Sequence, residues 1–380
     1  MAVLAGREDP IQAQPQRRHV SGQRDLNGLT GKGLVLVARN GEALRKFAEE
    51  FEDRGVHAVA VAADVSKREE LDDVARKAIA VFGGFDTWVN DAAVAVYGTL
   101  QEVPIADQRQ LFDVNYWGVV YGSLLAAQHL RGRGGTIINV GSVLSERAMT
   151  LQTQYSASKH AVKGFTDGLR MELEQEGAPI AVTLIKPSSI DTPYVEHARN
   201  YLEANTKVPP PAYDPDLVAK AIVFASEHAR RELTIGFGGW VIGALGKVAP
   251  RLTDKTMEMI GYASQTTDQP ERASMRDNLY RSREDGDTRS SLDVMTRKTS
   301  LLLSAQLHPV ATAAVLAGIG AAVAALLLPI GSVASPRRAK RLRPFEPAVR
   351  KTGNGHDKRS SGPGHLASRD AATRRPQVRH

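Results

Sequence analysis

Residues 135–159 read GTIINVGSVLSERAMTLQTQYSASK, and this stretch decides the fold. It opens with a short apolar run over 136–141 and ends in a longer segment of helical period that extends over 154–176. A buried strand followed by a helix is the repeating step of a sheet whose strands run parallel. The stretch therefore predicts one such step, with Ser142 at the carboxyl end of the strand.

The same alternation repeats on both sides of this stretch. Short apolar runs lie at 34–38, 56–62, 85–90, 136–141, 180–186 and, more weakly, 233–236, and helical segments lie at 41–54, 67–82, 105–130, 154–176 and 215–228. This order predicts an α/β protein, a doubly wound parallel sheet of the Rossmann-like class over residues 34–250. Asp64 and Asp214 fit the boundary or cap positions before two of the helices.

Tyr155 and Lys159 are four residues apart, which places both side chains on one face of the predicted helix. A free phenol titrates near pH 10, so a nearby cation is needed to make a tyrosine a usable acid or base at neutral pH. Alone, this spacing is weak evidence and is more often found on a solvated helix face. The neighbouring residues decide between the two readings.

Ser142 lies 13 residues before Tyr155, at the sheet edge where such folds bind ligands, and Asn115 lies 27 residues before Ser142 in a helical segment. A buried asparagine amide there needs specific partners. The order and spacing of Asn115, Ser142, Tyr155 and Lys159 resemble the tetrad of the classical short-chain dehydrogenase/reductase family. The resemblance covers 34–236, slightly more than half of the chain.

This resemblance implies an oxidoreductase that interconverts a hydroxyl and a carbonyl group with a nicotinamide cofactor. Tyr155 would exchange a proton with the substrate oxygen, and Lys159 would lower its pKa and bind the ribose hydroxyls. Ser142 would orient the substrate oxygen, and Asn115 would support a water in the proton path. Enzymatic activity is therefore expected.

Smaller motifs resemble the family's cofactor contacts. Asp64 matches the aspartate that contacts the adenine, and Asn90 opens Asn-Asp-Ala-Ala where the family has Asn-Asn-Ala-Gly. Pro187, Ile190 and Thr192 belong to a segment that resembles the Pro-Gly-x-x-x-Thr motif, in which Ser188 replaces the glycine. Arg39 follows a strand where an acid would bind the ribose 2′-hydroxyl, so we expect NADP(H) rather than NAD(H).

One family element is missing before the strand that ends near Arg39. No strand, Thr-Gly-x-x-x-Gly-x-Gly turn and helix precede it, although that turn normally lets the backbone approach the pyrophosphate. Gly28, Thr30, Gly31 and Gly33 directly precede the strand and predict a plain turn. We expect 1–33 to be a disordered leader and the sheet to lack its central first strand, for which only Ala2–Ala5 could substitute.

Two hypotheses explain this gap. The chain is a non-catalytic relative, or residues 1–33 reflect a wrong start or a frameshift in the gene of an active enzyme. We favour the second, because every predicted catalytic position survives in register. A non-enzymatic binding or scaffold protein on the same fold is the competing class of function.

The net charge of +7 is concentrated in one tail. Residues 337–380 hold 13 Lys and Arg against three acids, so the remainder is about −3 and gives nucleic-acid binding little support. We expect this tail to be disordered. The chain has no cysteine, which excludes disulfides and thiolate metal sites, and no metal site is expected. The first 33 residues lack the apolar core of a secretory signal.

Residues 251–299 predict an irregular linker, and the segment 300–336 that follows contains no charged side chain. Its apolar core at 310–328 is about 28 Å long as a helix, close to the thickness of a bilayer's hydrocarbon core. We expect a membrane helix, with a buried helix at a subunit interface as the alternative, in which case the protein is cytoplasmic.

The membrane hypothesis leaves a conflict over orientation. The basic residues that follow the apolar run favour a cytoplasmic tail, whereas the catalytic domain is expected to face cytoplasmic NADPH. The substrate class predicted is a small molecule, and the apolar, glycine-rich residues 234–246 hint at a lipophilic one. A homo-oligomer is left open.

Overall fold

The computed structural model describes residues 2–5, 33–270, 277–283 and 286–327. The chain divides into two units, Met1–Val323, which we call the compact unit, and Ala324–His380. The predicted basic tail at 337–380 lies outside the described residues, as do Gly28, Thr30 and Gly31.

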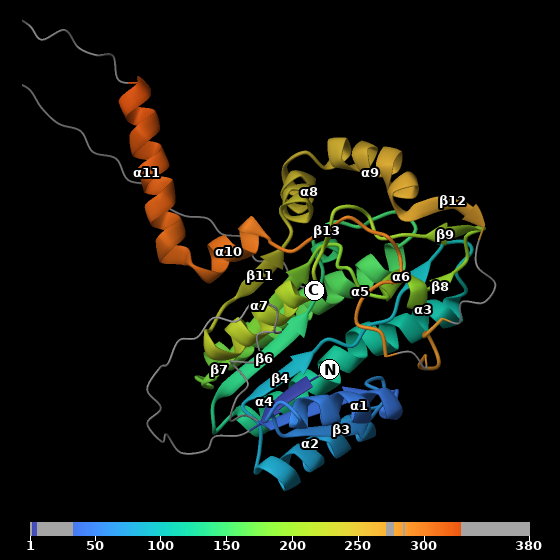
Figure 1. Ribbon diagram of the computed structural model, residues 1–380, viewed down its shortest axis with the longest axis vertical. Helices are drawn as coiled ribbons and strands as arrows, with labels where there is room; N and C mark the ends of the chain where they lie inside the picture. The colour runs from blue at the N-terminus through green and yellow to red at the C-terminus, as the bar shows by residue number, and fades with distance from the viewer. Residues whose placement is uncertain (1, 6–32, 271–276, 284–285, 328–380) are drawn as a thin grey trace, which may run out of the picture. The chain divides into compact units, whose positions relative to one another are not determined.

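A seven-stranded sheet forms the centre of the compact unit, in the order β11-β7-β6-β4-β1-β2-β3 (Figure 1). Its strands are β1 Ala2–Ala5, β2 Gly33–Ala38, β3 Ala58–Ala62, β4 Thr87–Asn90, β6 Gly135–Val140, β7 Ile180–Pro187 and β11 Glu232–Ile235. All neighbouring pairs except the two that involve β1 are parallel. The predicted doubly wound α/β fold is confirmed.

Side chains alternate along the strands and so bury two separate apolar layers. Val35 and Val37 pack with residues of α2 (Arg68–Phe82), whereas Leu34 packs with Ala48 of α1 (Gly41–Glu52). Trp88 and Ile137 share the layer that includes α5 (Thr153–Gln175). Val89 and Ile138 instead pack with α7 (Asp216–Glu227). The strand sequences are therefore almost entirely apolar, because helices cover both faces of the sheet.

β1 corrects two predictions made for the start of the chain. Ala2–Ala5 lies at the sheet's centre, between β4 and β2, so no strand position is empty and these four residues are not a disordered leader. However, β1 is antiparallel to both neighbours, and its Ala5 pairs with Gly33 while its Ala2 pairs with Leu36. A strand that feeds a crossover helix must run parallel to the next strand. β1 therefore fills the position of the family's first strand without its connectivity.

The helix predicted over 105–130 is interrupted. α3 (Ile105–Phe112) and α4 (Gly118–Leu130) are joined by a π-helical turn, Asp113–Trp117, which contains Asn115. Such a turn inserts an extra residue into the helical ladder and is frequent at functional sites. The apolar period continues through the insertion, which is why the sequence predicts one helix.

Residues 251–299 are not an irregular linker throughout. α8 (Phe237–Val248) is followed by α9 (Pro250–Gln265) and by β12 (Thr266–Pro270), which pairs with β9 (Ala204–Thr206). Further along, β13 (Thr296–Arg297) pairs with β10 (Ala212–Tyr213). The sequence does not predict these elements, because the segment is polar and its strands pair with residues far away in the sequence.

α10 (Leu301–Leu307) packs on the sheet, with Leu303 buried and Gln306 hydrogen-bonded to both backbone groups of Thr234. α11 (Pro309–Leu327) follows. Within the described ranges, no single helix is long and apolar enough to cross a membrane, although α10 and Pro309–Ala324, bent by 113°, pass that test as a pair. A single membrane helix over 310–328 is therefore not confirmed.

Candidate active site

Three residues of the predicted tetrad meet at the carboxyl edge of the sheet, where β6 ends and α5 begins. The Lys159 ammonium donates a hydrogen bond to the carbonyl oxygen of Val140 at 2.9 Å, and its Nζ lies 5.6 Å from the centre of the Tyr155 ring. Tyr155 and Lys159 are 8% and 2% exposed. The spacing of four therefore does bring phenol and ammonium together, in a site that excludes water.

Ser142 is held by a capping box at the start of a short 3-10 turn, Val143–Ser145. Its Oγ accepts from the Leu144 amide at 3.0 Å, and its own amide donates to the Ser145 Oγ at 3.2 Å. The Ser142 hydroxyl also lies close enough to the Tyr155 hydroxyl to lower its pKa. The two hydroxyls that would face one substrate oxygen are thus already adjacent.

Asn115 lies further back, fully buried in the π turn. Its Oδ1 accepts from the Val94 amide at 2.8 Å, and its Nδ2 donates to the Val94 carbonyl at 3.0 Å and to the Ser158 Oγ at 3.3 Å. The side chain therefore ties the loop after β4 to α5. The side chain thus has protein partners on both its oxygen and its nitrogen, and a role of Asn115 in supporting a water of the proton path stays a prediction.

Burial dominates the titration of the site. It raises the pKa of Tyr155 to about 12, against the lowering effect of hydrogen bonds with Tyr194 and Ser142. Burial also lowers the pKa of Lys159 to about 8, which the nearby carboxylate of Asp91 partly opposes. Burial therefore favours the protonated phenol of Tyr155 at neutral pH, and the lowering of its pKa by Lys159 stays a prediction.

Two of the residues expected to contact the cofactor have structural partners. The Asn90 amide accepts from Trp88 Nε1 at 2.9 Å and donates to Asn139 at 2.8 Å and to Ser123 at 3.0 Å. The Asp64 carboxylate accepts from the amide and hydroxyl of Ser66 in the turn before α2, so Asp64 is a boundary residue, whereas the N-cap of α2 is Lys67. Their side chains stabilise the sheet edge itself.

The segment that begins at Pro187 leaves the end of β7 beside β11. Ser188 donates its amide to the Ile235 carbonyl, and Ile190 bridges to Tyr213. Thr192 donates its amide to the Ile190 carbonyl, which forms a tight turn. The Ile190 and Thr192 side chains are half-buried, so the segment has surface left to contact a ligand.

Arg39 is already engaged by the chain itself. Its guanidinium donates to the carbonyl oxygens of Asn278 and Leu279, and Gln110 also donates to the Leu279 carbonyl. A ribose 2′-phosphate at Arg39 would have to share its donors with these carbonyls or displace them. This contact could not be predicted from the sequence, because Asn278 and Leu279 lie about 240 residues beyond Arg39.

Asn278 and Leu279 belong to a segment that we call the strap, the described residues 277–283 and 286–297. Buried carboxylates fix it. Asp107 accepts from Tyr280 at 2.8 Å and from Arg199 at 2.8 Å, and Arg199 pairs in turn with Asp277. Three further carboxylates hold the later part of the strap. Glu196 accepts hydrogen bonds from Ser290 and Ser291. Asp214 forms an ion pair with Arg289, and Asp191 accepts a hydrogen bond from Thr296. The strap therefore reaches from Arg39 to the segment after β7.

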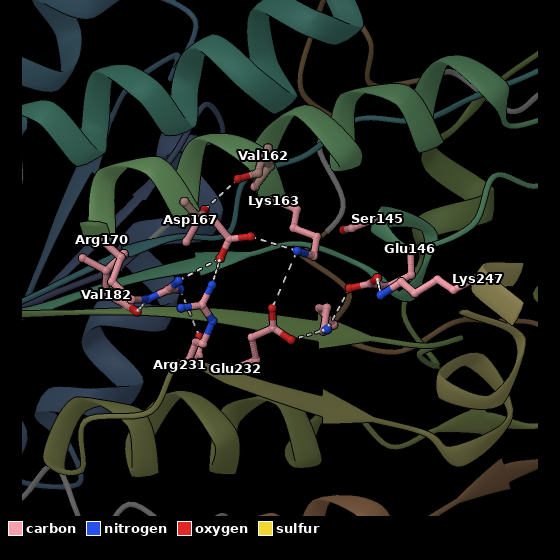
Figure 2. Close-up of polar contacts among 12 residues, drawn as sticks. Ser145, Glu146, Val162, Lys163, Asp167, Arg170, Val182, Arg231, Glu232 and Lys247 are labelled. Atoms are coloured by element: carbon pink, nitrogen blue, oxygen red, sulfur yellow. Dashed lines mark hydrogen bonds and ion pairs between the residues drawn. The ribbon is translucent and has the colours of Figure 1, made fainter. Parts of the chain in front are cut away.

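A second charge network connects α5 with the segment that follows Ser142 (Figure 2). Lys186 of β7, whose side chain is 7% exposed, bridges Glu146 at 3.0 Å and Glu232 at 2.5 Å. Burial raises the pKa of Glu146, but hydrogen bonds from Lys247 and Lys186 outweigh it and hold the pKa below its ordinary value. The network continues from Glu232 through Lys163 and Asp167 to Arg170 and Arg231. It fixes Glu146 four residues from Ser142.

α8 packs on the same segment through glycines. A Cβ on Gly239 would lie 2.7 Å from the Val143 side chain, and one on Gly243 would lie 2.9 Å from Glu146. A Cβ on Gly261 of α9 would lie 2.2 Å from Thr150 Oγ1. These close approaches place the glycine-rich residues predicted to flank the substrate site directly against the residues after Ser142.

Comparisons with known proteins agree with this geometry. The family model for the short chain dehydrogenase matches residues 28–202. An uncharacterized oxidoreductase, YxnA of Bacillus subtilis (strain 168), is 42% identical over 303 residues, which cover 78% of this chain and 84% of that protein. The chain therefore belongs to the short-chain dehydrogenase family, whose members are oxidoreductases that use a nicotinamide cofactor.

Other relatives match shorter parts. The 11-beta-hydroxysteroid dehydrogenase A of Sesamum indicum is 37% identical over 43% of this chain and 46% of its own length. A diacetyl reductase [(S)-acetoin forming] of Staphylococcus epidermidis is 32% identical over 40% of this chain and 59% of its own length. A crystal structure of a short-chain dehydrogenase from Streptomyces avermitilis superimposes with a TM-score of 0.49 at 26% identity, over 60% of this chain and 88% of that one.

The fit to a nicotinamide cofactor differs between the two ends of the site. Tyr155, Lys159 and the segment after Pro187 are together and can hold the nicotinamide and its ribose. At the other end, no described residue forms a glycine-rich turn, Gly33 is the first residue of β2, and Arg39 is bound to the strap. The donor set thus fits the reacting half of the cofactor better than its adenosine half.

Proposed function

We propose that this protein is an NADP(H)-dependent oxidoreductase that interconverts a hydroxyl and a carbonyl group, with Tyr155 as proton donor and acceptor. The observation that carries the proposal is the placement of the Lys159 ammonium 5.6 Å from the centre of the Tyr155 ring, with the Ser142 hydroxyl close to the phenol. Two hydroxyls beside a cation can hydrogen-bond a carbonyl oxygen and protonate it as the carbonyl is reduced to an alcohol.

Each residue has a defined part in the proposed reduction. Ser142 donates a hydrogen bond to the carbonyl oxygen and fixes its position. The Tyr155 O–H bond breaks as its proton passes to that oxygen, and the charged Lys159 stabilises the resulting phenolate. When bound, the cofactor supplies the hydride for the carbonyl carbon.

The protonation state of Tyr155 decides which proton-transfer step it is ready for at neutral pH. Since burial raises the pKa of Tyr155 to about 12, the phenol holds the proton that reduction consumes. Alcohol oxidation needs the phenolate as a base, and that form is scarce until the cofactor and substrate change the site. The protonated phenol is therefore the form that the proton-transfer step of carbonyl reduction requires near pH 7.

NADP(H) is preferred to NAD(H) because Arg39 stands at the end of β2 and no acid takes its place. The substrate is a small molecule. Relatives named for a hydroxysteroid and for diacetyl bracket a wide range of sizes, and the apolar exposed side chains of α8, such as Phe237 and Trp240, support a lipophilic substrate.

A binding experiment tests the proposal. Purified protein is titrated with NADPH while the cofactor fluorescence is followed, and carbonyl-dependent NADPH oxidation is then measured. We expect a micromolar dissociation constant and turnover. The absence of binding at millimolar NADPH would instead support a non-enzymatic binding protein, which the antiparallel β1 and the engaged Arg39 favour as the second candidate.

We further propose that α11 contacts a membrane. Its side chains include no charged group, and Val310 and Leu316 are 84% and 63% exposed. A chain truncated after His308 keeps α10 on the sheet and tests the idea. We expect the full chain, but not the truncated one, to pellet with lipid vesicles, and equal pelleting would remove the proposal.

A further inference from the structure

Tyr155 is part of a cluster of three tyrosines. Tyr194 of the short helix α6 (Tyr194–His197) lies edge-on to both neighbours, with ring centres 5.5 Å from Tyr155 and 6.5 Å from Tyr97. Tyr97 belongs to β5 (Val96–Tyr97), which follows the carboxyl end of β4. The three rings therefore bring their elements together at the substrate side of the candidate active site.

Two of the three hydroxyls have protein partners. Tyr194 donates to Gln152 Oε1 at 2.8 Å, and its hydroxyl lies close enough to that of Tyr155 to lower the Tyr155 pKa. Gln152 donates in turn to the Gln265 side chain at 2.5 Å, at the end of α9. These contacts form a continuous polar chain from Tyr155 to α9, and they account for the hydroxyls of Tyr155 and Tyr194.

The Tyr97 hydroxyl is different. The residue is fully buried, yet its oxygen has no hydrogen-bond partner among the residues that the structure describes. A buried phenol hydroxyl costs free energy unless something pairs with it, and phenylalanine would fill the same space without that cost. Its position beside Tyr194 and Tyr155 points to a partner that enters the active site.

We propose that Tyr97 is a substrate-binding residue whose hydroxyl donates a hydrogen bond to a second oxygen of the substrate, besides the oxygen that reacts at Tyr155. The preferred substrate class is then a ketone or secondary alcohol that carries a further oxygen acceptor, such as an ether, a hydroxyl or a second carbonyl. This inference rests on the proposed function, because it names the substrate class of the same site.

The alternative is that Tyr97 is a core tyrosine whose hydroxyl is hydrogen-bonded to an ordered water. The two readings differ in what Tyr97→Phe changes. A site built to hydrogen-bond a substrate oxygen discriminates against an analogue that lacks it, because a buried polar group is then left unpaired. A water-paired core tyrosine gives no such discrimination between substrates.

The test uses matched ketones in the full-length protein. Cyclohexanones with a methoxy group on carbon 2, 3 or 4 are compared with the ethyl analogues, which have the same shape but no second oxygen. We expect at least one methoxy isomer to show kcat/KM about tenfold above its ethyl analogue. Tyr97→Phe should abolish that preference while changing kcat/KM for the ethyl ketones less than about twofold. The position of the methoxy group in the preferred isomer then gives the distance between the two substrate oxygens.

Tyr121→Phe is the matched control, since Tyr121 lies on α4 and stacks with the exposed Trp117. It should keep the methoxy preference. A wild type without any preference, or a preference that persists in Tyr97→Phe, overturns the proposal. If no ketone is turned over, the proposed function fails. The role of Tyr97 is then tested by binding alone, with dissociation constants of the same ketone pairs measured by ligand-observed NMR.

Discussion

Arg39 donates hydrogen bonds to the backbone carbonyls of Asn278 and Leu279, which join the end of β2 to a segment 240 residues further along the chain. Arg39 is also the residue that the sequence assigns to the cofactor's 2′-phosphate. A carbonyl is a weaker acceptor for guanidinium than a phosphate, so a bound phosphate can compete for these donors.

Arg39→Ala is predicted to weaken NADPH binding selectively. A charge-assisted contact of this kind is worth about 10- to 100-fold in the dissociation constant, whereas NADH, which lacks the 2′-phosphate, should bind both proteins equally. Fluorescence titration with both cofactors measures this. Arg45→Ala on the exposed side of α1 is the control, and an equal loss of NADH affinity in Arg39→Ala would refute the assignment.

The pKa of Lys159 sets the pH dependence that we predict for carbonyl reduction. Its folded pKa is lowered by burial to about 8, so its ammonium is lost as the pH rises through that value, while Tyr155 keeps its proton to about 12. We predict that kcat/KM falls above about pH 8 with loss of one proton. A rate that stays level from pH 7 to 10 would show that Lys159 does not titrate in this range.

Lys186 is predicted to be essential to the stability of the segment after Ser142. Lys186→Met leaves Glu146 and Glu232 without their shared cation and should lower the free energy of unfolding by about 3 kcal/mol. The double variant Lys186→Met/Glu146→Gln should recover part of this loss, because it removes one of the two carboxylates that have lost Lys186 and leaves fewer acids around the vacated position. Urea unfolding measures both variants, and a double variant no more stable than the single one would contradict the predicted coupling.

Asp107 is predicted to hold the strap through its charge. Burial raises the pKa of its carboxyl, but hydrogen bonds from Tyr201, Arg199 and Tyr280 outweigh it and leave the pKa below its ordinary value. Asp107→Asn should therefore cost about 2 kcal/mol at pH 7 and make the strap more sensitive to proteolysis.

The sign of the pH dependence follows from the lowered pKa. The stability contributed by the Asp107 charge is present above the unfolded pKa near 4 and is lost as the pH falls through the folded value. The difference between wild type and Asp107→Asn should shrink below about pH 4. Asp287→Asn, at an exposed position of the strap, is the control, and a difference that stays constant with pH would exclude a role for the charge.

Local pattern explains what the sequence predicted well. The parallel strands are apolar runs of strand length, and the positions of Ser142, Tyr155 and Lys159 follow from one strand and one helix that are neighbours in the sequence. Their juxtaposition therefore needs no long-range information. The prediction that Arg39 and Asn90 face the cofactor was less secure, because each residue has partners that lie far away in the chain.

Long-range partners explain what the sequence missed. Ala2–Ala5 carries no signal that distinguishes an antiparallel strand from a parallel one, since its register depends on β2 and β4. The strap is polar and aperiodic, and it is fixed by buried carboxylates such as Asp107 and Glu196 that precede it by about a hundred residues or more. The π turn at Asn115 leaves the apolar period of its helix almost unchanged, and Tyr97 and Tyr194 belong to no motif.

Tyr155→Phe tests the central claim most directly, because it removes only the hydroxyl that would carry the proton. NADPH oxidation with a ketone substrate is followed for both proteins, together with NADPH affinity. We predict that kcat falls at least about a hundredfold in Tyr155→Phe while the NADPH dissociation constant changes less than about threefold. Turnover by Tyr155→Phe at the wild-type rate would contradict the assignment of Tyr155 as the proton donor.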